Sequence, residues 1–448
     1  MASTYLTRTN GTPTDLKIQT YSVWVKRSGL SSSTYRLFGG YDGSSGYSGE
    51  INFSSNQFRM EFGGSSLFEI KTNAVYRDTS AWYHLVVSID TTQATASDRV
   101  KLYVNGEQIT SLASSNYPSQ NATSLIGISG RTFVVGGGWS GAEPFDGSMA
   151  HVHFIDGTAY DASYFGQADA NGVWTIKTSP SVTYGNNGFF ILKDGNSVTD
   201  QSGNGNNFTV ASGTLTNTED NPSNVFCTLN PLNFTGIGTT TLNYGNTEFR
   251  DGGTTVNYSY VSGTIAVNSG KWYWETKVTG LAEIDQVGVA LASSNFASIS
   301  TSYGLLGTQY GGKGFQFSNG NKVGDGSQSA YMGAFSTNDI AMIALDLDNN
   351  KITFGRNGQW SDGAGSCNQT YANSTPAFTN LTAGEYYVPA QSKRAYGSNY
   401  GTNNYNFGNG YFGTTAVASA GTNASGIGIF EYDVPTGYTA LSTKGLNL

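Results

Sequence analysis

The stretch 338–360 restricts the fold more than any other part of the sequence, because it contains two strand patterns joined by tight turns. Every second residue of its first half is apolar: Ala341, Ile343, Leu345 and Leu347. This period of two is typical of a strand with one face against a core. Ile352 and Phe354 resume the alternation, and the pairs 349–350 and 357–358 tolerate the positive φ of hairpin turns. The stretch therefore predicts an antiparallel β-meander.

A second stretch, 82–106, repeats the pattern but not the residues. Alternating apolar positions lead to the turn pair 105–106: Tyr83, Leu85, Val87 and Ile89. Because the similarity lies in the pattern alone, we interpret the two stretches as parts of two sandwich domains and not as a repeat array.

Composition supports an all-β fold. The chain has 448 residues, enough for two or three domains with their own cores, and 59 of them are glycine. Aromatic residues make up 13% and charged residues only 12%, which is typical of turn-rich β-proteins. We expect two antiparallel β-sandwich, or jelly-roll, domains with almost no helix, joined by a connector that contains β-strands.

Charge and hydropathy exclude some partners. A net charge of −8 and a pI near 4.9 argue against nucleic acid, since phosphate binding needs clustered Lys and Arg. No stretch approaches the roughly 20 apolar residues of a membrane span, so no membrane insertion is expected. The N-terminus lacks the basic and apolar regions of a signal peptide, which predicts synthesis in a cytoplasm without signal-peptide secretion.

Specific motifs in residues 1–166 resemble a known fold. They are YSVWVKR, AWYHLVVSID, VKLYVNGEQI and FDGSMAHVHFIDGTAYD. Together they resemble a laminin-G-like or concanavalin A-like jelly roll. The D-x-S-G-x-G run that begins at Asp200 is similar to a segment common in laminin-G-like chains. We therefore expect residues 167–225 to form a connector packed on the first domain, with the boundary near 221–222.

Residues 226–448 resemble a SPRY domain in the order and spacing of their motifs. These are SGKWYWETKV, DQVGVAL, YGLLG, GKGFQFSNG, NDIAMIALDLDNNKITFGRNGQW, YYVPAQS, YNFGN and PTGYTALSTKGLN. The resemblance implies a second β-sandwich.

The combination of the two domains resembles structural proteins of bacteriophages, particularly marine phages, that decorate virions or form fibres and their tips. It implies a virion surface protein, made in the host cytoplasm, that acts as tail fibre, fibre tip or capsid decoration. Its lectin-like domains would attach to host-surface glycan, its partners would be other virion structural proteins, and phage fibres suggest a homo-oligomer, most simply a trimer. A purely structural virion subunit, a non-viral adhesin and a SPRY protein-interaction adaptor remain as alternatives.

No catalytic residues are predicted. Glycoside hydrolysis needs two carboxylates flanking a sugar, and the nearest candidates, Glu283 and Asp285, precede Gly288 where a third acid is expected. We interpret them as a charge pair at a strand edge. A serine hydrolase would need a nucleophile elbow and a histidine partner, and the sequence offers neither. We therefore predict that the protein is not an enzyme.

Binding is better supported, because loop aromatics can stack on sugar rings while short polar residues contact hydroxyls. Four aromatic residues stand among Gly, Ser and Asn: Trp139, Tyr310, Trp360 and Tyr396. Such loops combine adaptable polar contacts with rigid aromatic anchors. The same residues could instead fold back over the sandwich ends or lie in a subunit interface.

We predict no metal site and no cofactor. His151 and His153 fall on one face of a predicted strand, but two ligands do not make a site. Calcium is the weaker alternative, with carboxylates available in turns at Asp42, Asp146 and Asp200. No contiguous ligand series accompanies them, and Asp next to a turn is a common turn-forming residue.

Overall fold

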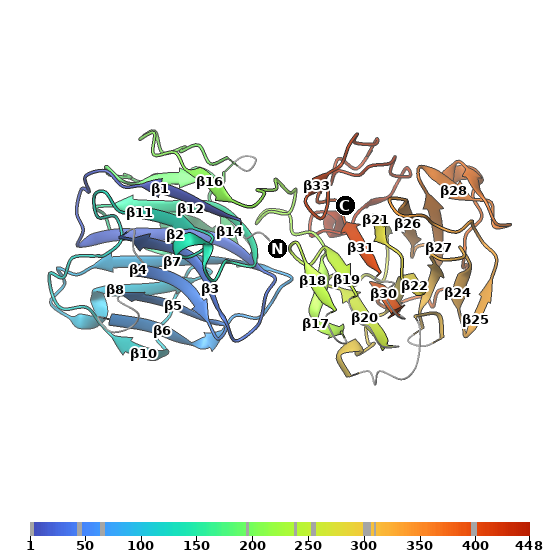
Figure 1. The fold of residues 1–448 in the computed structure, drawn as a ribbon, viewed down its shortest axis with the longest axis horizontal. Coiled ribbons are helices and arrows are strands. Elements are labelled where there is room, and N and C mark those ends of the chain that lie inside the picture. Colours follow the sequence, from blue (N-terminus) through green and yellow to red (C-terminus); the bar gives the residue numbers. More distant parts are fainter. Residues whose placement is uncertain are drawn as a thin grey trace. The chain divides into compact units, whose positions relative to one another are not determined.

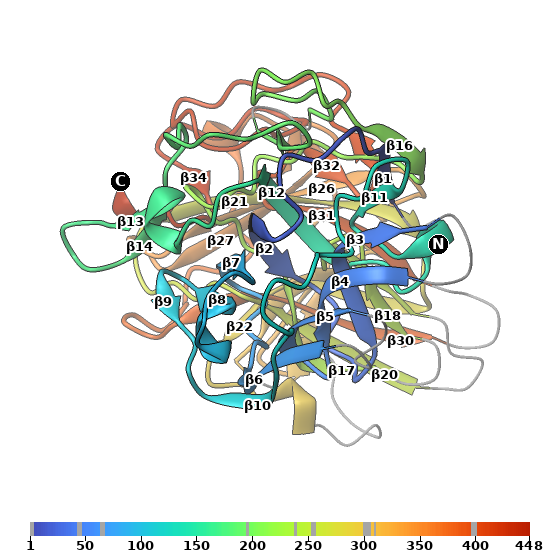
Figure 2. The same ribbon diagram turned by 90° about the vertical axis from the view of Figure 1, so that its left-hand side faces the viewer.

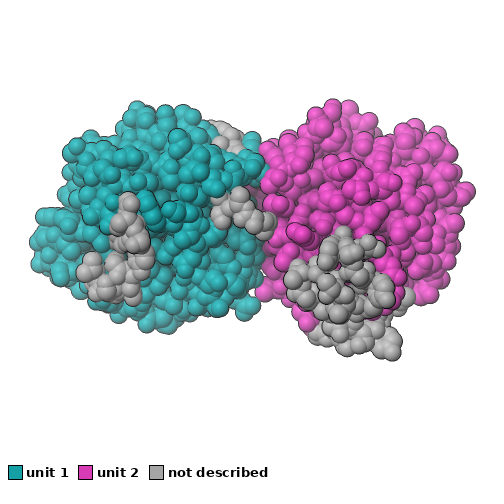
Figure 3. All heavy atoms as spheres, in the orientation of Figure 1, with its two compact units in different colours: residues 1–217 teal, residues 218–448 magenta. Residues whose placement is uncertain are grey.

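The computed structural model describes residues 4–42, 47–62, 68–193, 197–236, 240–251, 257–298, 306–308, 311–395 and 401–448. The chain divides into two compact units, Met1–Asn217 and Thr218–Leu448 (Figure 3). Both are built from β-strands, and the described part contains only short 3-10 helices, which confirms the all-β prediction. None of these helices is long and apolar enough to cross a bilayer.

Unit 1 is a sandwich of an eight-stranded and a six-stranded sheet (Figure 1). The first has the order β10-β6-β5-β4-β3-β11-β1-β16, with β1 (Tyr5–Thr9), β3 (Thr34–Tyr41), β4 (Tyr47–Ser54), β5 (Gln57–Phe62), β6 (Phe68–Val75), β10 (Leu112–Asn116), β11 (Thr132–Val135) and β16 (Thr209–Ser212). The second has the order β15-β12-β2-β7-β8-β9, with β2 (Ile18–Arg27), β7 (Trp82–Asp90), β8 (Val100–Val104), β9 (Glu107–Gln108), β12 (Gly147–Asp156) and β15 (Phe189–Ile191). A hairpin of β13 (Gly166–Ala168) and β14 (Trp174–Ile176) stands apart from both.

Alternation along the strands builds the core of unit 1. The predicted strand β7 places Leu85 and Val87 in the core, where they join Val23 of β2 and the phenylalanines Phe53 and Phe58 of the other sheet. The opposite residues of each strand are left for the outer faces.

Strands beyond residue 166 complete unit 1, because β15 pairs with β12 and β16 pairs with β1. Asp200 organises the loop between them. Its Oδ1 accepts hydrogen bonds from the backbone N–H groups of Phe190 and Ser202, and its Oδ2 accepts them from the Ser202 hydroxyl and the backbone N–H of Asn206. Both oxygens of this carboxylate thus bond to donors of the turn, as expected for a turn-forming Asp.

Unit 2 is a sandwich of a seven-stranded and a nine-stranded sheet. The first has the order β17-β20-β30-β22-β23-β24-β25, with β17 (Leu229–Thr235), β20 (Asn257–Gly263), β22 (Ile284–Leu291), β23 (Lys313–Gln316), β24 (Lys322–Gly324), β25 (Ser327–Ser329) and β30 (Tyr387–Ala395). The second has the order β18-β19-β31-β21-β26-β27-β28-β29, with β18 (Thr241–Asn243), β19 (Glu248–Arg250), β21 (Lys271–Gly280), β26 (Ile340–Asp346), β27 (Lys351–Arg356), β28 (Gln359–Ser361), β29 (Cys367–Gln369) and β31 (Thr402–Asn406), while β34 (Thr439–Ala440) pairs with β21 in parallel.

The meander predicted over 338–360 is strands β26, β27 and β28, which pair in sequence. Asn350 and Asn357 have φ of 53° and 49°, as the tight turns require. Strand β26 is buried on both faces, since a C-terminal segment packs over the side that does not face the sandwich core. We call residues 407–440 the C-terminal cover.

Candidate functional site

Charged side chains line the outer face of the eight-stranded sheet in unit 1. On β4 and β5, Glu50 and Glu61 are direct cross-strand partners, and Glu61 in turn faces Glu69 of β6. They point away from the core because the intervening residues, such as Ile51 and Met60, fill it. The result is a row of three acidic residues across three neighbouring strands, which lie side by side in Figure 2.

A second polar row, of three cationic residues and one asparagine, runs beside the acidic one. Arg36 of β3 faces Asn52, Asn52 faces Arg59, and Arg59 faces Lys71 of β6. On β4, β5 and β6 each of these positions lies two residues along its strand from the acidic row, and therefore on the same face. Arg36 joins them as the cross-strand partner of Asn52. We call these residues, together with the acidic row, the charged face.

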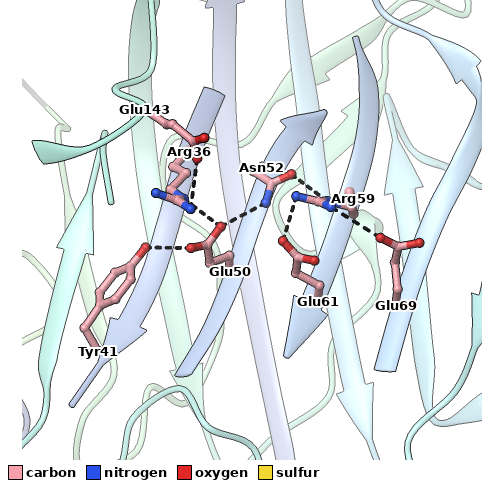
Figure 4. A network of polar contacts seen from close by, with 8 residues as sticks. All are labelled: Arg36, Tyr41, Glu50, Asn52, Arg59, Glu61, Glu69 and Glu143. Carbon is pink, nitrogen blue, oxygen red and sulfur yellow. Dashed lines mark hydrogen bonds and ion pairs between the residues drawn. The ribbon is translucent and has the colours of Figure 1, made fainter. Parts of the chain in front are cut away.

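Short contacts join the two rows into one network (Figure 4). Arg36 Nε lies 2.7 Å from Glu50 Oε2, and Asn52 Nδ2 donates to the same oxygen at 3.2 Å. Arg59 donates from Nε to Asn52 Oδ1 at 3.0 Å and lies 2.6 Å from Glu61 and 3.3 Å from Glu69. The network therefore runs without a break from β3 to β6.

Burial makes it unfavourable to place these acidic side chains next to one another. The side chains of Glu50 and Glu61 are 0% and 4% exposed, and like charges opposite each other on a sheet repel. Burial raises the pKa of Glu61, with Glu50 and Glu69 adding to the effect and Arg59 opposing it. Burial is the largest single influence on the pKa of Arg36 and would lower it, but the charge and hydrogen bond of Glu50, together with Tyr41 and Glu143, outweigh burial and the pKa is raised. The charge of Arg59 thus opposes the rise in the pKa of Glu61 that burial causes.

Two aromatic rings border the network on the β3 side. The Tyr41 ring lies over Gly39, where an added Cβ would come within 2.6 Å of it, and the Tyr41 hydroxyl donates to Glu50 at 3.2 Å. Trp139, in the glycine-rich loop before β12, has its ring centroid 6.3 Å from that of Tyr41. The same loop supplies Glu143, whose carboxylate lies 2.9 Å from Arg36. The predicted binding residue Trp139 is therefore half-exposed at the border of the charged face.

The other predicted binding residues lie elsewhere. Trp360 belongs to β28 and is 4% exposed, so the expectation of a loop position is wrong. Its ring meets Tyr371 edge-on at 4.8 Å and joins the cluster formed by Phe430 of the C-terminal cover, which closes it off from ligands. Tyr310 and Tyr396 lie outside the described residues.

The histidines of unit 1 are held by aromatic packing. His153 stacks on Phe190 at 3.9 Å and shares a 3.0 Å hydrogen bond between Nδ1 and the Tyr184 hydroxyl. A bulge in β12 falls between Ala150 and His153, which disrupts the regular strand spacing. The described ranges contain no group of three or more His, Cys, Asp or Glu that could hold a metal ion.

A buried pair of Ser22 and His84 also lies in this unit, and sequence reasoning did not single it out. The Trp174 indole N–H donates to His84 Nδ1 at 3.0 Å, so the proton of the neutral ring sits on Nε2, 2.9 Å from the Ser22 hydroxyl. Burial lowers the pKa of His84 to about 3. In this tautomer His84 donates to Ser22 and is not placed to accept its proton as a general base.

Asp285 lies inside unit 2, so its interpretation as part of a strand-edge charge pair is wrong. It shares the inward face of β22 with Val287 and Val289 and is fully buried, 3.7 Å from Lys393 Nζ. Glu283 alone is near the surface, 3.9 Å from Arg394. Asp285, Val287 and Val289 occupy alternate positions in the sequence, so the period-two pattern already indicated that Asp285 shares the face of the valines.

Comparison with known proteins identifies both domain types. Residues 2–162 match the concanavalin A-like lectin/glucanases superfamily, and residues 271–402 match the SPRY domain. A search of curated proteins found no match.

Solved structures match at low sequence identity. The SPRY domain of human HERC1 is 18% identical, covers 40% of this chain and 96% of its own, and has a TM-score of 0.30. A putative carbohydrate binding protein from Bacteroides ovatus is 16% identical, covers 48% of this chain and 59% of its own, and has a TM-score of 0.31. Stonustoxin is 19% identical, covers 40% of this chain and 27% of its own, and has a TM-score of 0.29. By its family matches, the chain therefore combines a concanavalin A-like domain with a SPRY domain.

Proposed function

We propose that this protein is a non-enzymatic, lectin-like virion surface protein whose charged face binds host-surface glycan. The observation that carries the proposal is the half-exposed Trp139 ring beside a continuous Arg–Glu network. An indole ring packs on the apolar side of a sugar, while fixed guanidinium and carboxylate groups donate and accept hydrogen bonds to its hydroxyls.

The residues of the charged face divide into two roles in this proposal. Arg36, Arg59, Glu69 and Glu143 retain exposed surface and would contact the sugar directly. Glu50 is buried beneath them and holds Arg36 in place, so it acts as a positioning residue. Such pre-organisation limits the side-chain entropy lost on binding.

Hydrolysis is less well supported than binding. Glu50 and Glu61 lie opposite each other, yet a glycosidase needs two carboxylates that reach the substrate. Their side chains are closed off from solvent, and each contacts an arginine. The face thus offers fixed polar contacts without a free acid and nucleophile.

The virion assignment rests on the resemblance of the domain order to phage structural proteins. In this proposal the protein is a tail fibre, fibre tip or capsid decoration subunit at the virion surface, with other virion proteins as partners, and it assembles as a homo-oligomer, most simply a trimer. Immunogold labelling of virions tests the location. Light scattering that gives a monomer at micromolar concentration would remove self-assembly from the proposal.

Glycan-array binding tests the site. We expect wild-type protein to bind a defined set of glycans, and Trp139→Ala to weaken that binding about tenfold or more, the typical loss for an anchor aromatic. The matched control is Tyr386→Ala, since Tyr386 is an exposed aromatic residue of unit 2. Unchanged binding by correctly folded Trp139→Ala would contradict the assignment of the site. A purely structural subunit, the second candidate, predicts no glycan binding by any of the three proteins.

A further inference from the structure

A buried lysine and aspartate face each other in the sandwich of unit 2. Lys393 on β30 and Asp285 on β22 are direct partners in the antiparallel register. Both side chains are 0% exposed, and Nζ lies 3.7 Å from Oδ2. Desolvating two charges commonly costs more than their attraction returns, so a buried ion pair is weakly explained by stability alone.

The surroundings favour the uncharged forms of both groups. Burial lowers the pKa of Lys393, and burial raises the pKa of Asp285, with the partner's charge opposing the shift in each case. Transfer of one proton from Lys393 to Asp285 would give an amine with a free lone pair next to a carboxylic acid. These are the reactive forms for making an amide.

The Asp285 carboxyl group is oriented by a fixed amide. Gln391 Nε2 donates to Asp285 Oδ1 and, at 2.8 Å, to Asn403 Oδ1. The Tyr405 hydroxyl donates to Gln391 Oε1 at 2.6 Å, which fixes which end of the amide faces Asp285. The Gln391 amide therefore donates to Oδ1 of Asp285, whereas Oδ2 lies 3.7 Å from the Lys393 nitrogen.

The amine is held by β19 and its neighbourhood. Lys393 Nζ donates to the carbonyl oxygen of Phe249 at 2.8 Å and lies 4.7 Å from the centre of that ring. Asp251, also fully buried, acts electrostatically on both Lys393 and Asp285. Its Oδ1 accepts a 2.9 Å hydrogen bond from the Thr240 hydroxyl, so a second buried carboxylate belongs to this neighbourhood.

We propose that Lys393 and Asp285 join in an intramolecular isopeptide bond between β30 and β22. The amine Nζ bonds to Cγ of the protonated Asp285, and the negative charge that develops on Oδ1 is stabilised by the Gln391 N–H. The Asp251 carboxylate takes a proton from the nitrogen and delivers it to the Oδ2 hydroxyl. The Cγ–Oδ2 bond then breaks, one water molecule leaves, and the amide carries one hydrogen on nitrogen.

The bond would brace two adjacent strands of the seven-stranded sheet and close the chain between residues 285 and 393. The inference is independent of glycan binding, because it concerns unit 2 and uses none of the charged face. It assigns a covalent modification to residues that would otherwise form a costly buried pair.

Intact mass spectrometry of the denatured full-length protein tests the proposal. We expect wild-type protein to be lighter than its sequence mass by one water molecule. Trypsin would then fail to cut after Lys393 and would release one branched peptide composed of residues 278–313 and 357–394. A folded wild-type protein with its full sequence mass, and two separate peptides in the digest, would overturn the proposal.

Variants identify the bond. Lys393→Arg and Asp285→Ala should show their full sequence masses, and Asp251→Asn should slow or abolish the loss of water while unit 2 stays folded. The matched control is Lys313→Arg, which alters another Lys–Asp contact, that of Lys313 with the exposed Asp325, and should keep the loss. If Lys313→Arg abolished the loss instead, the assignment to Lys393 would be wrong. Should the core variants fail to fold, the tryptic map of wild-type protein decides by itself.

Discussion

The backbone N–H of Tyr432 donates a 2.8 Å hydrogen bond to the carboxylate of Glu275, in the middle of the nine-stranded sheet. The Glu431 N–H donates to the same carboxylate at 2.9 Å, the Tyr273 hydroxyl at 2.9 Å and the Asn406 amide at 3.3 Å. One fully buried carboxylate on the outer side of β21 therefore fastens the C-terminal cover to the sheet.

The burial of Glu275 predicts a pH-dependent stability. Burial raises the pKa of Glu275 to about 7 from 4.5, although the hydrogen bonds oppose the shift. Because the folded state holds the proton more tightly, the stabilisation is fully present below pH 4.5 and is lost as pH rises through about 7. The loss amounts to roughly 3 kcal/mol.

Urea denaturation of wild-type protein and Glu275→Gln over this pH range measures the effect. The free energy of unfolding of wild-type protein should fall with rising pH relative to that of the glutamine variant, which cannot titrate there. Glu385→Gln, at an exposed position, is the control and should follow wild-type protein. Parallel curves for wild-type protein and Glu275→Gln would contradict the prediction.

Replacing Arg59 by Met should destabilise unit 1 by about 3 kcal/mol, because it leaves the buried Glu61 without its ion-pair partner. Lys101→Met is the control, since the pair of Lys101 with Asp98 is exposed and such pairs contribute about 0–1 kcal/mol. Chemical denaturation of both variants gives the comparison. If both variants lowered the free energy of unfolding by the same small amount, the network would contribute no more to stability than an exposed ion pair does.

Replacing Gly39 by Ala should weaken glycan binding without unfolding the protein. The added Cβ would push the Tyr41 ring away from the sheet and lengthen its hydrogen bond to Glu50, which disturbs the support of Arg36. Gly11→Ala is the control, because an added Cβ there meets only Asn187 at 3.4 Å, an ordinary contact. Glycan-array titration should separate the two variants, and full binding by Gly39→Ala would argue against the role of Tyr41.

Short-range periodicity explains what the sequence predicted well. The meander over 338–360 depends on neighbouring residues and turn pairs, and its strands pair as expected. The burial of Trp360 depends on Phe430, far along the chain, and no local pattern contains that contact. The Gly, Ser and Asn residues around Trp360 are typical of a loop and therefore predicted an exposed ring, whereas the ring is buried.

The charged face shows a signal that sequence reasoning passed over. Glu50 and Asn52, like Arg59 and Glu61, are polar residues that alternate with core residues in adjacent strand patterns. That alternation places each pair on an outer face. Which glutamate contacts which arginine depends on the register between the strands. The residues of the turns alone did not predict that register.

The C-terminal cover also sets how this chain can be shortened. The SPRY match ends at residue 402, whereas Phe430, Val434 and Tyr438 lie beyond it and pack on Tyr273 and Trp360. A fragment trimmed to the family limits would expose an aromatic surface and leave Glu275 without its backbone donors. Recombinant boundaries drawn from the family matches would therefore yield an aggregation-prone, poorly soluble fragment, and the C-terminal cover acts as a built-in solubility element of unit 2.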